Sequence, residues 1–279
     1  MSVRSLRYSD LSLRLPKGTS ALPIERDAWA FLEAAGITSA LQQRAVVQLV
    51  RDLKKAKLWT KMKAVYPFVG GTATTHKWNL KDPQDTNAAF RLTFSGGWTH
   101  DANGVTGNGT NAYADTHLAP STVLTINDHH AGVYVGSDTS GSTIKCEIGS
   151  YVTISYVRYL VIYSKFNNLT YMVSGDNVFP NFANSNAKGM YLLAKSTVTT
   201  LDGYKDATKK LTNSTTSDRG GSQSTSDVYI GAAKGDGTAV YYSDRRISYA
   251  TIGQDLTDAE ATLLYECVDR YQKTLGRAV

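Results

Sequence analysis

Paired carboxylates are the first chemistry to look for in this chain, which is rich in Gly, Thr, Ser, Asn and Tyr. Most glycosidases cleave with two carboxylates that flank the scissile bond, about 5 to 9.5 Å apart. Between Glu33 and Glu260, however, the sequence holds a single glutamate, Glu147. The preceding aspartates, Asp128 and Asp138, lie in loop-like sequence. We therefore predict no catalytic residues and no enzyme; a pair of aspartates brought together by folding is the alternative.

Other nucleophile and metal patterns are also missing from the sequence. No Gly-x-Ser-x-Gly elbow accompanies the Ser, His and Asp residues. His129 and His130 are adjacent, so on a strand they would point to opposite faces and could not chelate one ion. We expect them to be solvated loop histidines. Cys146 and Cys267 are too few for a disulfide framework and have no metal-ligand spacing, so we expect two buried free thiols and no metal site.

One loop partly imitates a calcium site. Residues 101–108 include Asp101, Asn103 and Asn108, whose side-chain oxygens are of the kind that calcium takes. The loop lacks the terminal bidentate carboxylate of such sites, which favours ordinary turn formation. We predict no cofactor, with calcium as the alternative.

Sugar recognition would use flat aromatic rings against pyranose faces and fixed polar groups for the hydroxyls. One loop-rich stretch supplies suitable types, and Tyr241 and Tyr242 add two more rings near the closing strands. All of these types also occur as packing and turn residues. The candidate glycan-binding residues are Trp98, His100, Asp101, Asn103 and Tyr113.

The elements that must position these residues begin with helices. Apolar residues recur at helical spacing from Pro23 to Leu58, and Gly36 divides the stretch in two. We expect a helix over 27–35 that ends at Gly36, and a second that opens with a capping box at Ser39 and runs to about Lys57. The two form a small helical hairpin.

Residues 51–63 carry six basic side chains against one acid, Asp52, which is most of the formal net charge of +6. Nucleic-acid readers usually interleave aromatic residues or present a recognised module, and neither is evident, so we predict no nucleic-acid partner. The alternatives left are a solvated polar face and a docking surface for an acidic partner. The candidate docking residues are Arg51, Lys54, Lys55 and Lys57.

Beyond Pro67 the apolar period becomes two, which is typical of half-buried strands. Phe90 to Phe94 alternates in this way, and so does the stretch from Ile144 to Ile148, which would place Glu147 on the non-core face of a strand beside Lys145. Several more short strands follow, separated by turn residues. Many short strands of this kind predict a β-sandwich.

A last helix closes the chain. Thr257 and Glu260 have the spacing of a capping box, so Glu260 is predicted to be structural. The expected organisation is an extended basic arm over 1–20, a helical docking segment over 21–66 and a β-sandwich with its C-terminal helix over 67–279. No run of about 18 apolar residues is present and no signal peptide is visible, so we predict no membrane span and synthesis in a bacterial-type cytosol.

Two blocks of sequence resemble a known family. The segment 107–115, Gly-Asn-Gly-Thr-Asn-Ala-Tyr-Ala-Asp, resembles the opening strand of concanavalin A-like, LamG-type jelly-roll domains. Residues 228–231 and 242–249, followed by the helix entry at 256–260, resemble their closing strands. The resemblance implies a mainly β protein: a concanavalin A-like antiparallel β-sandwich, preceded by the helical hairpin and closed by the C-terminal helix. Glucanases of this fold carry a Glu-x-Asp-x-Glu or similar string, and this chain has none.

The helical front, which runs into residues 59–71, makes the whole arrangement similar to structural proteins of tailed bacteriophages that carry such a domain. This similarity implies a non-enzymatic virion component at a tail, fibre, baseplate or capsid surface. Its partners would be other virion proteins, a host-surface glycan and, as an open alternative, further copies of itself. A carbohydrate-binding module and a polysaccharide depolymerase remain the alternative functions.

Overall fold

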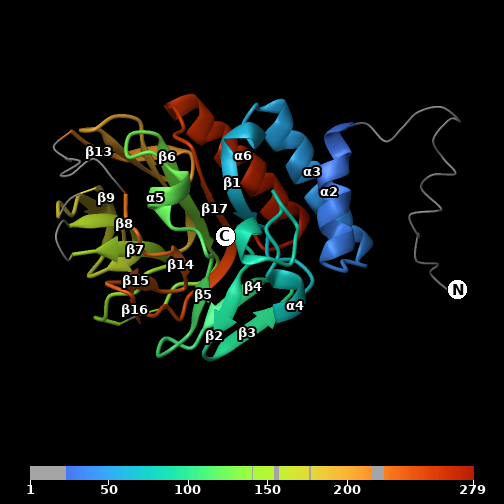
Figure 1. The fold of residues 1–279 in the computed structure, drawn as a ribbon, viewed down its shortest axis with the longest axis horizontal. Coiled ribbons are helices and arrows are strands. Elements are labelled where there is room, and N and C mark those ends of the chain that lie inside the picture. The colour runs from blue at the N-terminus through green and yellow to red at the C-terminus, as the bar shows by residue number, and fades with distance from the viewer. Residues whose placement is uncertain (1–22, 140, 154–156, 176, 215–222) are drawn as a thin grey trace, which may run out of the picture.

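The computed structural model describes residues 23–139, 141–153, 157–175, 177–214 and 223–279. The predicted arm over 1–20 lies outside the described residues. Within these ranges the protein consists of two sheets packed face to face and a group of helices on one flank (Figure 1). The predicted mainly β sandwich with N-terminal helices and a C-terminal helix is confirmed. No helix among the described residues is both long enough and apolar enough to cross a membrane.

The first sheet has eight strands, paired antiparallel throughout. In order across the sheet they are β13 (Thr208–Asn213), β12 (Leu201–Lys205), β11 (Gly189–Lys195), β6 (His129–Val135), β17 (Arg246–Gly253), β4 (Gly104–Gly107) and β3 (Trp98–Asp101), and β1 (Met62–Tyr66) also pairs with β17. Strand β17 is therefore bonded to three neighbours that come from distant parts of the chain.

The second sheet has nine strands. In order they are β10 (Asn181–Ala183), β9 (Leu169–Gly175), β8 (Arg158–Phe166), β7 (Ile148–Val152), β14 (Tyr229–Ile230), β5 (Tyr113–Asp115) and β2 (Thr93–Ser95), and the hairpin of β15 (Ala233–Gly235) and β16 (Thr238–Val240) joins β7. Strand β15 runs parallel to β7, with Ala233 opposite Gly149. The other pairings of this sheet are antiparallel.

Period-two alternation fills the space between the sheets. On β8, Leu160 and Ile162 belong to the core between the sheets, whereas Val161 and Tyr163 lie on the outer face. Burying one such aliphatic side chain stabilises the fold by about 1.5–3 kcal/mol relative to its exposure. The alternation seen in the sequence is thus the physical basis of the sandwich.

A second core joins the helices to the outer face of the eight-stranded sheet. The helices are α2 (Pro23–Ala34), α3 (Ala40–Lys55) and α6 (Asp258–Thr274), with short turns of helix at α4 (Ala73–His76), α5 (Pro120–Val123), η1 (Trp59–Lys61) and η2 (Asn87–Ala89). Leu53 of α3 and Leu264 of α6 are buried in one cluster with Met190 and Leu192 of β11. Figure 1 shows α2, α3 and α6 together on the flank of this sheet. The division of the chain at residue 67 stays a prediction, and β1, which precedes it, is a strand of the sandwich.

The predicted helix ends are confirmed where a capping side chain marks them. The Ser39 hydroxyl accepts a hydrogen bond from the Gln42 amide at the start of α3. At α6, Thr257 and Glu260 form the reciprocal capping box, and Glu260 also accepts from Lys61 Nζ at 2.6 Å. Glu260 is therefore structural, as predicted.

The C-terminal end of the described chain is tied into the same region. The guanidinium of Arg277 is buried and donates to the carbonyl oxygens of Pro67, Phe68 and Ser248 at 2.8 to 2.9 Å. Residues after α6 thereby fix the segment that follows β1 to strand β17.

The predicted position of Glu147 is wrong. The alternation predicts it on the polar face of a strand beside Lys145, but β7 begins only at Ile148, so Glu147 stands outside the alternation. Its side chain is 0% exposed and accepts from Arg245 Nη1 at 2.9 Å and from the Ser164 amide at 2.7 Å. A buried carboxylate requires such partners, because an unpaired buried charge is very costly.

The prediction of solvated loop histidines is also wrong. His129 and His130 begin β6, whose two faces are covered by the opposite sheet and by the helical flank, and both are 0% exposed. They do point to opposite faces: His129 contacts the Ser174 hydroxyl at 2.6 Å, and His130 contacts the Gln254 carbonyl. Burial lowers the pKa of each imidazole to about 4.

Candidate functional site

The outer face of the nine-stranded sheet carries a row of aromatic rings. Most of these rings come from β7, β8 and β9, Phe179 and Tyr241 come from connecting segments, and the described helices α2, α3 and α6 pack on the other sheet. We call this surface the tyrosine face. Its residues are Tyr151, Tyr159, Tyr163, Phe166, Tyr171, Phe179 and Tyr241.

Five rings of the tyrosine face, those of Phe179, Tyr159, Tyr151, Tyr241 and Tyr163, contact one another in series, and Phe166 and Tyr171 form a separate pair. Tyr151 stacks on Tyr159 with ring centroids 5.0 Å apart and planes 30° apart. Phe179 meets Tyr159 edge-on at 5.2 Å, and Tyr241 meets Tyr163 edge-on at 5.9 Å. Phe179 and Tyr241 are 37% and 38% exposed. The result is an extended, partly exposed aromatic surface on a β-sheet.

The backbone beneath the rings is shaped to let them lie flat. A Cβ atom added at Gly235 would stand 2.1 Å from the Tyr151 ring, so only glycine leaves room for it there. Tyr241 has a φ of +59°, in the left-handed region that costs a non-glycine residue about 1–2 kcal/mol. Such strain often accompanies functional positions. Here it sets the ring of Tyr241 over its neighbours.

The phenols of Tyr151 and Tyr159 keep their protons. Burial, with a smaller contribution from Tyr241, raises the pKa of the Tyr151 phenol, and burial likewise raises the pKa of Tyr159. The nearby Asp236 carboxylate accepts two hydrogen bonds from Thr153, at 2.7 and 2.5 Å. Phenols that keep their protons can both donate and accept hydrogen bonds, as sugar hydroxyls do.

Trp98 and His100, predicted from the sequence, lie together in a packed aromatic cluster. Trp98 meets Phe94 edge-on at 5.4 Å, and its Nε1 donates to the Ser95 carbonyl at 2.9 Å. His100 Nδ1 lies 3.1 Å from His76 Nδ1, and burial lowers the pKa of both histidines, that of His76 to about 3. A glycan-binding role for this cluster stays a prediction.

The other three predicted residues are close by but serve local structure. The Asp101 carboxylate accepts a hydrogen bond from the Asn103 amide at 2.7 Å and so closes the turn between β3 and β4. The Tyr113 ring stacks on Tyr229 with centroids 4.5 Å apart and planes 9° apart. Within the described ranges no three His, Cys, Asp or Glu side chains gather into a metal-binding group. Calcium at residues 101–108 stays an untested alternative.

Sequence reasoning named Tyr241 and missed the rest of the tyrosine face. The signal was present in Tyr159, Val161 and Tyr163, every second residue of one strand. In the sequence these positions are indistinguishable from the general apolar alternation. What the sequence does not show is which sheet face the helices leave uncovered.

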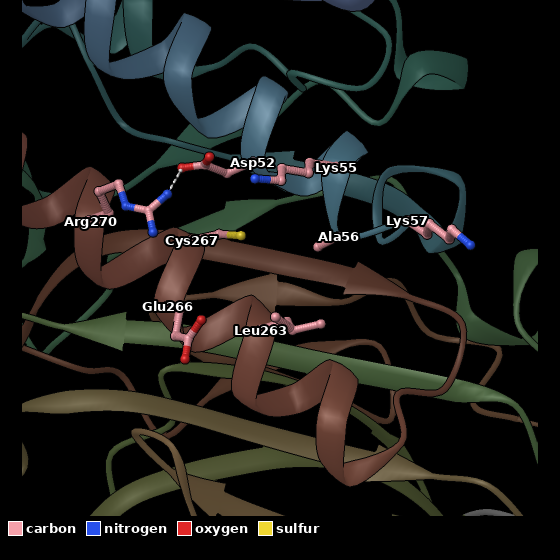
Figure 2. Close-up of a pocket in the computed structure, with 8 residues that line it drawn as sticks. All are labelled: Asp52, Lys55, Ala56, Lys57, Leu263, Glu266, Cys267 and Arg270. Carbon is pink, nitrogen blue, oxygen red and sulfur yellow. Dashed lines mark hydrogen bonds and ion pairs between the residues drawn. The ribbon is translucent and has the colours of Figure 1, made fainter.

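The predicted docking residues divide into two pairs. Arg51 is paired with Glu25, and Lys54 with Asp27 at 2.6 Å, so these two tie α3 to α2. Lys55 and Lys57 instead line a groove of about 410 Å³ between α3 and α6 (Figure 2).

Comparison with known proteins supplies the fold and no family. No family model matches the chain, and no curated protein matches it. Among solved structures, Trypanosoma rangeli sialidase with 2,3-difluorosialic acid superposes with a TM-score of 0.56 at 12% identity, over 81% of this chain and 39% of the sialidase. The same sialidase with 2,3-difluoro-KDN gives 0.55 at 11% identity, over 80% and 39%.

A third structure is domain 4 of the Geobacillus stearothermophilus arabinanase AbnA with arabinotriose, at a TM-score of 0.49 and 14% identity, over 74% of this chain and 98% of that domain. That likeness is too low to support an argument. The chain spans about two fifths of the sialidase, and at 11–12% identity the likeness shows a shared β-sandwich fold alone.

Proposed function

We propose that this protein is a non-catalytic glycan-binding β-sandwich and that the tyrosine face is its binding surface. The observation that carries the proposal is the row of contacting, partly exposed rings on a sheet face that the helices leave open. Tyrosine combines a flat apolar ring, which suits the C–H face of a pyranose, with a hydroxyl that bonds to sugar oxygens. Proteins that act on sugars also occur among the structures with this fold.

The carboxylates near the sandwich support binding without cleavage. Glu147 is buried in an ion pair with Arg245, and Glu260 is engaged by the capping box of α6 and by an ion pair with Lys61. At the tyrosine face itself, Asp236 accepts from Thr153 and Asp138 pairs with Lys165. Hydrolysis by two carboxylates needs one that is protonated and one that reaches the scissile bond.

A tyrosine nucleophile of the kind that sialidases use is also disfavoured. That chemistry needs an activated phenol. The pKa values of Tyr151 and Tyr159 are raised rather than lowered, because burial and the neighbouring Tyr241 disfavour the phenolate. The phenols are therefore suited to hydrogen bonding.

The proposed setting is the virion of a tailed bacteriophage, at a tail, fibre, baseplate or capsid surface, where the face would contact a host glycan. This finer assignment rests on the sequence resemblance. A polysaccharide depolymerase is the competing function, and release of reducing ends from host capsule by the purified chain would favour it.

Binding to a glycan array tests the proposal. Tyr241→Ala should weaken binding about fivefold to tenfold, in line with 1–1.4 kcal/mol for one aromatic contact. Tyr265→Ala on α6, a tyrosine on the helical flank, is the matched control and should bind as the parent does. Trp98→Ala, measured on the same array, tests the site predicted from the sequence. Loss of binding in Trp98→Ala but not in Tyr241→Ala would favour that site over the tyrosine face. An array without signal, or equal binding by Tyr241→Ala and the parent, would refute the proposal.

A further inference from the structure

A groove of about 410 Å³ separates the end of α3 from α6 on the helical flank. Figure 2 shows Lys55, Ala56 and Lys57 on the α3 side of the groove, with Leu263 and Glu266 on the α6 side, and the Lys57 side chain pointing outward at the rim. It belongs to the flank that covers the eight-stranded sheet, whereas the tyrosine face lies on the other sheet. The lining residues are Asp52, Lys55, Ala56, Lys57, Leu263, Glu266, Cys267 and Arg270.

Some charged side chains of the groove form ion pairs, and others do not. Asp52 and Arg270 pair with each other across it at 2.7 Å. Lys55 and Lys57 are both exposed, and neither has an ion pair within 4 Å among the residues that the structure describes. Beside them Leu263 is 39% exposed, a large apolar side chain on the surface of a helix. The groove therefore presents two lysine side chains beside an exposed leucine side chain.

The backbone at Lys57 adds an independent observation. After the last turn of α3, the Leu58 amide donates to the Leu53 carbonyl at 2.8 Å and Lys57 has a φ of +60°, the geometry of a Schellman motif. Glycine is the residue that such a position favours, since a side chain there is strained. A lysine at this position places an ammonium at the rim of the groove at a cost in stability.

We propose that the groove docks an acidic segment of a partner protein, whose carboxylates meet Lys55 and Lys57 and whose apolar side chain covers Leu263. Charge complementarity selects this occupant. A nucleic-acid backbone fits less well, because two lysines offer few phosphate contacts and no aromatic ring lines the groove for base stacking. The proposal does not depend on glycan binding.

Fluorescence anisotropy on the full chain tests this docking site. The probe is a labelled synthetic peptide that alternates glutamate and leucine, and the reference peptide carries glutamine in place of glutamate. The parent should bind the glutamate peptide and should bind the glutamine peptide markedly less. Lys57→Gly should weaken binding about threefold and Lys55→Ala with Lys57→Gly about tenfold, the range for exposed ion pairs.

Lys57→Gly is a sharp variant because it relieves backbone strain, so its thermal midpoint should rise while its affinity falls. Loss of binding then cannot be blamed on unfolding. Lys188→Gln, which removes an exposed positive charge elsewhere, is the matched control and should bind as the parent does. Both variants should keep any glycan binding, which separates this test from that of the tyrosine face.

Four outcomes would contradict the proposal of a docking site for an acidic segment. They are no binding of the glutamate peptide, equal binding of the glutamine peptide, unchanged affinity in the double variant, and competition by duplex DNA as effective as by unlabelled peptide. The last result would identify a general polyanion surface instead.

Discussion

Glu147 and Arg245 form an ion pair of 2.9 Å in which the two side chains are 0% and 2% exposed. Ser243 Oγ donates to the same carboxylate at 3.1 Å, and Arg245 Nη2 donates to the Lys165 carbonyl at 2.9 Å. The pair joins the loop before β7 to the segment before β17, and so it connects the two sheets at one end of the sandwich.

Removal of one partner of this pair should destabilise the protein strongly. Glu147→Gln leaves the Arg245 guanidinium buried without its counter-charge, which costs about 3–5 kcal/mol. Urea unfolding measures the loss. Replacement of both residues by methionine should cost less than Glu147→Gln alone, because no charge then remains buried. A double variant no more stable than Glu147→Gln would show that the unpaired buried charge is not the source of the loss.

Gly235→Ala should disturb the tyrosine face from below. The new Cβ would meet the Tyr151 ring at 2.1 Å, so the ring must turn away from Tyr159. We expect a loss of about 1–3 kcal/mol in the free energy of unfolding, as for other overpacked sites, and weaker glycan binding. Addition of Tyr151→Ala should restore stability but not binding. If the double variant is no more stable than Gly235→Ala, the clash lies elsewhere.

Stability should fall as the pH drops from about 6.5 to about 4. Burial lowers the folded-state pKa of His129 and His130 to about 4, while Lys195 lowers that of His129 further and the Thr125 carbonyl opposes the shift. In the unfolded chain the histidines titrate near 6.5, so between these values the unfolded state binds more protons. Each pKa unit corresponds to about 1.4 kcal/mol.

Urea unfolding of the parent and of His129→Gln, at pH 7 and at pH 5, measures this dependence. The introduced glutamine amide would keep a donor near Ser174 without titrating, so the variant should lose less stability between the two pH values. Parallel pH profiles would mean that His129 is not a source of the effect.

The cap of α6 should contribute a measurable share of stability. Thr257→Ala removes the hydroxyl that accepts from the Glu260 amide at 3.3 Å and should cost about 1 kcal/mol. Thr257→Ser keeps that hydroxyl and should stay near the parent in a thermal melt. A fall of equal size in both variants would attribute the loss to the threonine methyl group instead.

Local signals in the sequence predicted much of the fold. Ser39, Gly36 and the Thr257–Glu260 box marked helix ends because caps satisfy backbone groups of their own helix and need no tertiary context. Alternation predicted the sandwich because a strand that buries one face alternates apolar and polar residues.

The errors arose where tertiary context decides. His129 and His130 were expected to be exposed, but both are buried. The second face of β6 is covered by helices that come much earlier and much later in the chain, and no local pattern in the sequence shows this. Glu147 was misplaced because the strand begins at Ile148, whereas the alternation suggested a start at Ile144, and its partner Arg245 is distant in sequence. The tyrosine face was incomplete for the same reason, since pairing of β7 with β8 brings Tyr151 to Tyr159, and Tyr241 reaches them from the segment after β16.

The position of β17 has a consequence for protein synthesis. Because β1, β4 and β6 all pair with β17, and Arg277 fastens the segment after β1, the eight-stranded sheet cannot be completed on the ribosome until the segment from β17 to Arg277 has emerged. The earlier strands then wait with unpaired edges, the state in which nascent chains aggregate most readily. Yield in a cell should therefore depend on chaperone supply more than the stability of the finished fold would suggest.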